Sequence, residues 1–347
     1  MYIKKILIII VLLGAVGMGA FAWYVYNTAF SGNTAFNNKE AHVYIPSNAT
    51  IADVAEELEP LLRDTESFIT IAHQKKYSPN IKPGHFIIKR GMTNNDIVNT
   101  LRSKNIPINV KFNNQERLED LAGHISNQIE ADSISLLEAM RDPKFLKEVG
   151  LNEETALSLY IPNTYEFYWN SFAETFRDRM KSEYERFWNE DRMEKAKKLN
   201  LSPEKVMALA SIVQKETAKV DERPRVAGVY LNRLKVGMLL QADPTVIYAI
   251  KRSTNDYGQI IKRVLYKDLE TDSPYNTYKY AGIPPGPITM PDISSIDAVL
   301  NPENHDYYYF VADVTNFGYH KFAKSLTQHN VNKAEYVRWV NSQGLNR

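Results

Sequence analysis

The amino-acid sequence predicts an α+β protein with an N-terminal transmembrane helix, small strand–helix modules and a mainly helical C-terminal domain that contains a small β-sheet. Three observations support this fold class: an apolar run near the N-terminus, three gap-free copies of a strand–helix pattern, and helical patterns through the second half of the chain. The 347 residues are enough for two or three domains. We place a transmembrane anchor at residues 1–26, a linker at 27–40, the modules at 41–149 and the C-terminal domain at 150–347.

The composition excludes several kinds of chemistry. The chain has no Cys, which excludes disulfides, thiol catalysis and Cys-ligated metals and fits an extracytoplasmic protein. A net charge of +1 gives no indication of a nucleic acid partner. The sequence has no His, Asp and Glu spacing typical of a metal site and no Gly-rich phosphate loop. We therefore expect no metal, no cofactor and no nucleic acid partner.

The first element is the apolar run from Ile6 to Tyr26. About 20 residues are needed to cross a bilayer as a helix, so this run is long enough. Lys4 and Lys5 precede it and no Lys or Arg follows until Lys39, which places the N-terminus in the cytoplasm and the rest of the chain outside. A cleaved signal peptide is the alternative, and a small-residue triplet near the end of the run resembles a cleavage site. The apolar region of a signal peptide is usually only about 7–15 residues long. The longer run in this chain therefore favours an uncleaved anchor in the cell membrane.

The small polar residues of the linker lead into three copies of a strand–helix pattern. Each copy alternates apolar and polar residues, then turns, then continues as an amphipathic helix. Thr50 and Thr93 are expected to cap the first two helices, because each is followed three residues later by an Asp. Arg117 stands at this position in the third copy. The copies begin at Val43, Phe86 and Val110.

Small strand–helix units of this kind resemble LysM-like modules, which bind N-acetylglucosamine polymers in other proteins. The resemblance implies that this region binds a glycan. The residues themselves leave open a second role, as spacers or rigid adaptors.

The C-terminal domain is expected to contain an amphipathic helix that begins at Ser202 and Pro203 and continues to Val220. Glu216 lies on the apolar stripe of this helix. A carboxylate on an apolar face is costly unless it is paired or protonated. The helix alone leaves two interpretations open: a partly buried Glu bonded to a cation or an amide, or a carboxyl group whose raised pKa allows proton transfer near neutral pH. The stripe consists of Val206, Leu209, Ala210, Val213, Thr217 and Val220.

The remaining elements are read from periodicity and turn residues. Helical patterns occupy residues 135–149 and 172–199. Residues 307–325 alternate around a turn with Asn316 and Gly318 and predict a β-hairpin, and a closing helix is expected from about residue 327 to 342. His320 and His329, which lie in these last segments, are interpreted as structural residues.

Two polar segments are candidates for substrate binding. One is the turn LQADPT, where Asp followed by Pro also fits a simple turn cap. The other is the loop SPYNT, where a loop without any binding role is the alternative. The candidate binding residues are Gln241, Asp243, Thr245, Tyr275, Asn276 and Thr277.

Four stretches together resemble the endolytic murein transglycosylase family (YceG-like, MltG-type). Two of them, LQADPT and SPYNTYKYAGIPPGPI, are long and unusual. The resemblance covers most of residues 40–345, and it implies a catalytic C-terminal domain that acts on peptidoglycan. The stretches are YIPNTYEF (160–167), ALASIVQKET (208–217), VAGVYLNRLKVGMLLQADPTVIYAI (226–250) and SPYNTYKYAGIPPGPI (273–288).

The resemblance also implies a reaction and a catalytic residue. The family usually has two Glu residues in a segment like SIVEKE, whereas this chain has Gln214 at the first position and keeps only Glu216. Glu216 is therefore the implied catalytic acid. A lytic transglycosylase cleaves the β-1,4 bond between N-acetylmuramic acid and N-acetylglucosamine without water and leaves a 1,6-anhydro end. In this family the cut falls within nascent glycan strands and ends their elongation.

The sequence leaves two alternative functions open. The chain is expected to bind peptidoglycan and the membrane, and cell-wall synthases are partners implied by the family alone. A non-catalytic peptidoglycan-binding scaffold of the synthesis machinery is one alternative. A muramidase-type hydrolase, which would leave reducing ends, is the other.

Overall fold

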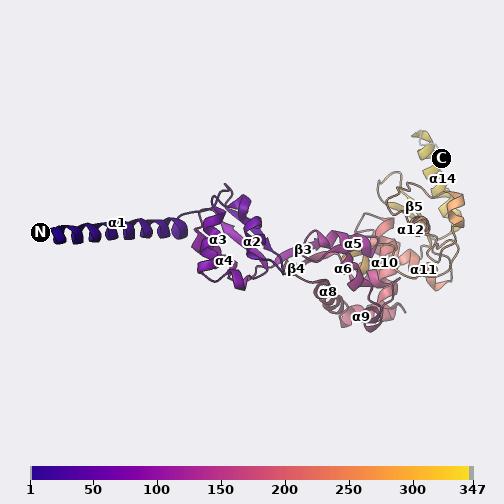
Figure 1. The fold of residues 1–347 in the computed structure, drawn as a ribbon. Helices are drawn as coiled ribbons and strands as arrows, with labels where there is room; N and C mark the ends of the chain where they lie inside the picture. Colours follow the sequence, from indigo (N-terminus) through magenta and orange to yellow (C-terminus); the bar gives the residue numbers. More distant parts are fainter. Residues whose placement is uncertain (1, 344–347) are drawn as a thin grey trace. The chain divides into compact units, whose positions relative to one another are not determined.

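The computed structural model describes residues 2–343. Within these residues the chain is mostly helical, and its strands form three two-stranded sheets (Figure 1). This confirms the predicted mixture of helices with small sheets and an apolar N-terminal helix.

The described chain divides into two compact units. The first contains residues 2–110, 127–131 and 165–172, and the second contains residues 111–126, 132–164 and 173–343. The boundary that we placed between residues 149 and 150 lies inside the second unit. The second unit contains Glu216 and all six candidate binding residues.

The N-terminal helix α1 (Tyr2–Phe30) is long and apolar enough to span a membrane. It continues four residues beyond the predicted anchor, and its last turn packs on the first unit through the buried Ala29. The segment that we expected as a linker is also packed, because Asn33 and Thr34 are buried. Asn33 Nδ2 donates to Asn94 Oδ1 over 2.7 Å, so hydrogen bonds hold this segment against the first unit.

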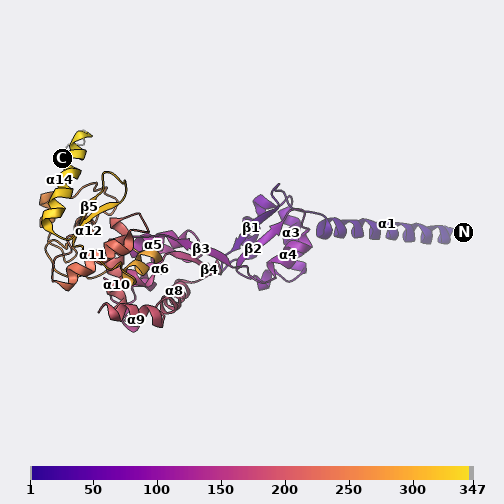
Figure 2. The ribbon, with the colours of Figure 1, turned by 180° about the vertical axis from the view of Figure 1, so that it is seen from behind.

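The first unit is built around the antiparallel pair β1 (Glu40–Ile45) and β2 (Gly84–Lys89). Val43 lies opposite Phe86, so the first residues of the first two sequence copies are cross-strand partners. Figure 2 shows these strands with helices α3 and α4 beside them. The helical elements of this unit are α2 (Ile51–Leu58), η1 (Glu59–Leu61), α3 (Thr65–Gln74), η2 (Ser78–Asn80) and α4 (Asn94–Leu101).

The predicted caps and the third copy are confirmed as secondary structure. Thr50 and Thr93 each form a capping box with the Asp three residues later. The third copy forms β3 (Ile108–Phe112) and α5 (Leu118–Ser126), and β3 pairs with β4 (Asn163–Phe167). The strand–helix order is thus as predicted, and the likeness to LysM modules stays a prediction.

The second unit has its hydrophobic core around α10, which packs against α11, α12 and α13. The predicted hairpin and closing helix are present as β5, β6 and α14. The elements of this unit besides α5 are α6 (Ser133–Arg141), α7 (Pro143–Glu148), η3 (Ala156–Leu159), α8 (Ala173–Phe187), α9 (Glu190–Lys198), α10 (Pro203–Glu216), α11 (Arg223–Lys235), α12 (Asp243–Thr254), η4 (Tyr266–Glu270), α13 (Ile293–Leu300), β5 (Tyr309–Ala312), β6 (His320–Ala323) and α14 (Leu326–Ser342).

Helix α10 begins as predicted and ends earlier than predicted. Ser202 and Pro203 form its N-terminus, although the Ser202 side chain makes no capping hydrogen bond. Glu216 is its last residue, because Thr217 has extended backbone angles (φ −139°, ψ 133°). The prediction that the apolar stripe continues to Val220 is wrong, since Val220 is 57% exposed. Glu216 therefore lies at a helix C-terminus and not along a helix face.

Candidate active site

Glu216 lies at a cavity of about 350 Å³ in the second unit. The cavity is formed where the end of α10 meets the start of α12, the loop before Lys279, the hairpin β5–β6 and the start of α14. Its lining residues are Glu216, Arg233, Gln241, Asp243, Tyr278, Tyr309, Phe310, Val311, Ala312, His320, Leu326 and His329.

The Glu216 carboxyl group is half-buried and oriented by one tyrosine. Tyr230, which is buried on α11, donates its hydroxyl to Glu216 Oε1 over 2.6 Å. This bond leaves Oε2 without a contact to Tyr230. Because α10 and α11 pack directly against each other, the position of the carboxyl group is fixed by the core of the unit.

The surroundings of Glu216 raise the pKa of its carboxyl group to about 7. Burial is the main cause, because it disfavours the charged form. The hydrogen bond from Tyr230 and the positive charges of His320 and Arg233 oppose the rise, while the carboxylate of Asp243 adds to it. The C-terminal end of a helix carries partial negative charge, which also disfavours a carboxylate at this position. Glu216 is thus able to exchange a proton near neutral pH.

Two of the candidate binding residues, Gln241 and Asp243, line the same cavity as Glu216. Asp243 is the first residue of α12, where the partial positive charge of a helix N-terminus favours a carboxylate. Its Oδ1 accepts the hydroxyl of Tyr278 over 2.6 Å. Gln241 has a left-handed backbone (φ 48°), which turns the chain sharply just before the helix. Both side chains belong to exposed residues.

Three other candidate residues, Thr245, Asn276 and Thr277, are buried and bonded within the protein. The hydroxyls of Thr245 and Thr277 are 2.8 Å apart, and Thr277 Oγ1 also accepts the backbone N–H of Ala242 over 3.0 Å. Asn276 Nδ2 donates to the carbonyls of Leu269 and Thr271. These bonds hold the start of α12, which carries Asp243, against the loop that contains residues 273–278.

The structure places Tyr275 away from the cavity of Glu216. Its buried ring packs on Tyr248 with 4.8 Å between ring centroids, and its hydroxyl donates to Glu154 Oε2 over 2.7 Å. It lines a separate, strongly polar cavity together with Glu154 and Arg252. The six candidate binding residues are therefore divided: two lie at the cavity of Glu216, three are buried supports and one lies at another cavity.

His320 and Glu222 also contribute to this site, and the sequence pattern did not indicate this for either residue. Glu222 is almost fully buried and accepts two hydrogen bonds from His320, from its backbone N–H over 2.7 Å and between Oε2 and Nδ1 over 2.8 Å. His320 lines the cavity, so its ring is held in one orientation beside Glu216. From the sequence, His320 was interpreted as a structural residue.

Burial and hydrogen bonding act in opposite directions on Glu222. Burial alone would raise the pKa of its carboxyl group. The hydrogen bonds and the charge of His320 outweigh burial and hold the pKa below its usual value. Glu222 is therefore an ionised carboxylate that fixes His320 by hydrogen bonds, whereas the raised pKa of Glu216 favours its protonated form.

The side chain of Gln214, the residue that departs from the family pattern, makes hydrogen bonds between elements of the protein. Its Nε2 donates to Asp292 Oδ2 over 2.9 Å, and its Oε1 accepts the hydroxyl of Ser295 over 2.5 Å. These contacts join α10 to the start of α13. They use the side chain at both ends, and Gln214 is absent from the residues that line the cavity of Glu216.

The chain also matches a family of known proteins over the part that contains this site. The model of the YceG-like family matches residues 43–335. The chain belongs to the YceG-like family. Among the residues that the structure describes, no group of three or more His, Asp or Glu side chains is arranged to hold a metal ion.

Several bacterial proteins are similar to this chain along most of its length. An endolytic murein transglycosylase of Bacillus subtilis (strain 168) is 29% identical over 336 residues, which cover 87% of this chain and 86% of the relative. An endolytic murein transglycosylase of Streptococcus pneumoniae serotype 2 is 26% identical and is covered over 59% of its length. The crystal structure of a YceG-like protein from Listeria monocytogenes aligns with a TM-score of 0.57 and 30% identity, covering 85% of this chain and 99% of that one.

Proposed function

We propose that this chain is an endolytic peptidoglycan lytic transglycosylase in which Glu216 is the catalytic acid and base. One observation carries the proposal: a carboxyl group with a pKa of about 7 faces a cavity at the end of α10. The similarity to relatives named endolytic murein transglycosylases supports the choice of substrate. The bond cleaved is the β-1,4 bond between N-acetylmuramic acid and N-acetylglucosamine within glycan strands.

The proposed reaction needs one group that first gives a proton and then takes one. Glu216 protonates the glycosidic oxygen while the bond from this oxygen to C1 of N-acetylmuramic acid breaks. The Glu216 carboxylate then removes the proton from the C6 hydroxyl of the same sugar, whose oxygen bonds to C1. The product is the 1,6-anhydro sugar, no water is consumed, and Glu216 is protonated again. A pKa near neutral pH suits both steps.

Neighbouring residues support the two steps in different ways. Tyr230 holds Oε1 of Glu216, which leaves Oε2 to exchange the proton. Asp243 places a carboxylate at the same cavity, where it stabilises the positive charge that develops at C1. Gln241 offers an exposed amide for the hydroxyl or acetamido groups of the sugars. We assign Thr245, Asn276 and Thr277 as positioning residues for this loop, and Tyr275 to its support.

A muramidase-type hydrolase is the second candidate function, and Asp243 is the observation that favours it. A hydrolase normally uses two carboxyl groups, and Asp243 supplies a second one at the cavity. In a hydrolase, water would add at C1 and a reducing end would form. A non-catalytic scaffold for the synthesis enzymes remains as a third candidate, and it requires no protonated Glu216.

One assay separates these functions. The full-length protein is incubated with purified peptidoglycan strands, and the products are analysed by mass spectrometry. We expect 1,6-anhydro ends, which are lighter than reducing ends by one water. Glu216→Gln is expected to lower kcat by about 10²- to 10⁴-fold, because Gln cannot donate a proton. Reducing ends would favour the hydrolase, and equal activity of the variant would contradict the role of Glu216.

The cellular setting is also part of the proposal. Helix α1 is proposed to anchor the chain in the cell membrane as a single pass, with the catalytic unit on the extracytoplasmic side. Cleavage there would act on nascent glycan strands and end their elongation. Cell-wall synthases are the proposed partners, because they make the strands that this enzyme would cut.

A further inference from the structure

A second cavity of about 290 Å³ lies in the same unit as the candidate active site and takes part in none of the steps above. Lys215, which lines it, directly precedes Glu216, and Pro244, which also lines it, directly follows Asp243. Consecutive Cα atoms are about 3.8 Å apart. The end of α10 and the start of α12 therefore carry residues of both cavities.

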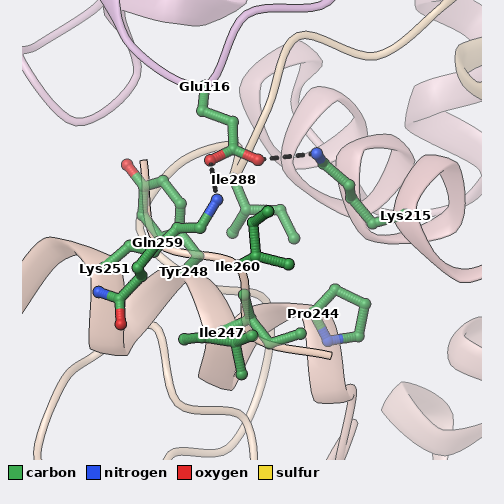
Figure 3. Close-up of a pocket in the computed structure, with 10 residues that line it drawn as sticks. Glu116, Lys215, Pro244, Ile247, Tyr248, Lys251, Gln259, Ile260 and Ile288 are labelled. Carbon is green, nitrogen blue, oxygen red and sulfur yellow. Dashed lines mark hydrogen bonds and ion pairs between the residues drawn. The ribbon is translucent and has the colours of Figure 1, made fainter. Parts of the chain in front are cut away.

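The polar side of this cavity carries an excess of positive charge. Glu116 lies between two lysines and accepts from Lys215 over 2.8 Å and from Lys251 over 2.9 Å (Figure 3). These are the charged residues of the lining, and their sum is +1. Each ammonium group has three N–H donors and uses one of them on Glu116. The pair thus retains donors for a second carboxylate, and such bonds between charged groups are strong.

The other side of the cavity is apolar. Ile247 and Pro244 from α12 face Ile260 and Ile288, as Figure 3 shows. Ile260 is 84% exposed, so its side chain is accessible to an occupant of the cavity. An occupant that suits both sides has a carboxylate at one end and small apolar groups along its body. A neutral sugar chain lacks the carboxylate.

We propose that this cavity binds the peptide stem of the peptidoglycan strand that Glu216 cleaves. This inference rests on the proposed function. The peptide branches from N-acetylmuramic acid, which is the sugar at Glu216, and it contains alanine methyl groups and free carboxylates. Lys215 and Pro244 are one position away in the chain from Glu216 and Asp243. An extended peptide spans up to about 3.3–3.6 Å per residue, so a stem of several residues is long enough to reach this cavity from a sugar at Glu216. Lys215 and Lys251 receive the carboxylate, and the isoleucines contact the methyl groups.

The first test compares Lys251→Met on two substrates. Lys251 is suited to substitution because its side chain is only 14% exposed and Lys215 still pairs with Glu116 in the variant. We expect KM to rise about tenfold for strands that carry peptide stems, because one charge-assisted bond is lost. We expect no change for strands whose peptides have been removed by an amidase. Lys205→Met, at an exposed position near the start of the same helix as Lys215, is the matched control.

The second test changes Glu116, the acidic partner of both lysines, and predicts the opposite change in KM. Glu116→Gln removes the carboxylate that competes for both lysines, so KM for stem-bearing strands is expected to fall about threefold or more. A purely structural ion pair predicts that both substitutions weaken the enzyme, and on both substrates alike. Equal effects on the two substrates, or no effect on either, would overturn the proposal.

A binding measurement separates this inference from the proposed function. The inactive Glu216→Gln protein is titrated with the free stem peptide in a calorimeter, and then with the same peptide after its carboxylates are amidated. We expect binding of the first peptide only, and a loss of that binding in the added Lys251→Met variant. Binding of inorganic pyrophosphate without binding of the peptide would overturn the inference in favour of a lipid-linked anion. If the wild-type protein cleaves neither strand, the proposed function fails, while this titration still tests the cavity.

Discussion

Glu216 and Asp243 line the same cavity, but Glu216 lies at the C-terminal end of one helix and Asp243 at the N-terminal end of another. Glu216 ends α10, where the helix disfavours a negative charge, and Asp243 begins α12, where the helix favours one. Pairs of carboxyl groups in contrasting environments commonly divide the roles of acid and charge stabiliser. The backbone therefore helps to assign the two roles before any substrate is bound.

The raised pKa of Glu216 predicts a gain in stability when the acid is removed. Its pKa is about 7 in the folded protein and near 4.5 in the unfolded chain. The folded state therefore loses stability as pH rises from the lower of these two values through the higher one. One pKa unit corresponds to about 1.4 kcal/mol. Glu216→Gln is expected to raise the free energy of unfolding by roughly 1–3 kcal/mol above about pH 8, and to change it little below about pH 4.5. Urea denaturation of both proteins at the two pH values measures this. A variant less stable at alkaline pH would contradict the assignment.

Tyr230 predicts a shift in the pH dependence of activity. Its hydrogen bond lowers the pKa of Glu216, so removing the hydroxyl raises that pKa further. Because Glu216 must be protonated to act as the acid, the fall in activity at alkaline pH should move to higher pH in Tyr230→Phe. We expect kcat near neutral pH to fall about tenfold, since the carboxyl group is less well oriented. A pH–kcat profile from about pH 5 to 10 measures both effects. A shift to lower pH would be inconsistent with this hydrogen bond.

Glu222 predicts the opposite dependence of stability on pH. Its pKa is lowered in the folded protein, so its contribution is present above the pKa of the unfolded chain and is lost as pH falls through the folded pKa. Glu222→Gln replaces one acceptor oxygen by an N–H donor, and one bond from His320 is lost. We expect a loss of about 2–3 kcal/mol at pH 7 that shrinks in acid. Chemical denaturation from pH 7 into the acid range measures this loss of stability. Glu216→Gln is the matched variant, because its change in stability is expected to have the opposite sign.

The sequence singled out Glu216 as the candidate acid but did not indicate the residues that contact it, and the reason is physical. Glu216 could be singled out because a carboxylate on an apolar stripe is costly wherever the helix packs. Tyr230 and His320 follow it by 14 and 104 residues, and their contacts depend on how α11 and the hairpin pack on α10. Thr245 and Thr277 were predicted to bind substrate. Their burial, which separates support from substrate contact, is a tertiary property that the sequence does not reveal.

Helix α10 illustrates what periodicity can predict about an element. Its start was predicted correctly, because a proline at the first helical position is a local signal. Its end was not, because no Gly or Pro follows Glu216 directly, and apolar spacing continued to Val220. The early end is accompanied by a buried Thr217 and by the anchoring of Glu222, which are contacts between elements.

The start of α12 predicts a test at the scale of an element. Thr277→Val keeps the shape of the side chain and removes the hydroxyl that accepts from Ala242 and contacts Thr245. A buried N–H is then left without its partner, so we expect a loss of about 1–3 kcal/mol in stability. The start of α12 carries Asp243, so a less firmly held start should displace this side chain in the cavity and raise KM. Thermal denaturation and kinetics measure the two effects. Thr254→Val, at an exposed position at the end of α12, is the control, and equal loss in both variants would argue against a special role for residue 277.

At the scale of the whole molecule, the sequence predicted the order of elements better than their grouping. The three strand–helix copies are present, and the pairing of Val43 with Phe86 shows that the first two copies form one sheet. The third copy contributes instead to the second unit with α5. A repeat in sequence is a local property, whereas membership of a compact unit depends on which distant strand pairs with each copy. Helix α1 likewise extends past its apolar run, because its last turn finds a partner in Asn94.

The orientation of the chain in the membrane can be tested because the sequence contains no Cys. A single Cys introduced at Asn38, an exposed residue beyond α1, is expected to react with a membrane-impermeant maleimide in intact cells whose outer layers have been made permeable. A single Cys at Tyr2 should react only after the cytoplasmic membrane is lysed, because the proposed orientation, which follows from Lys4 and Lys5, places that end inside. The reverse pattern would contradict the proposed orientation. Loss of the Tyr2 label from a shortened protein would instead identify α1 as a cleaved signal, so the two positions together test both the side and the permanence of the anchor.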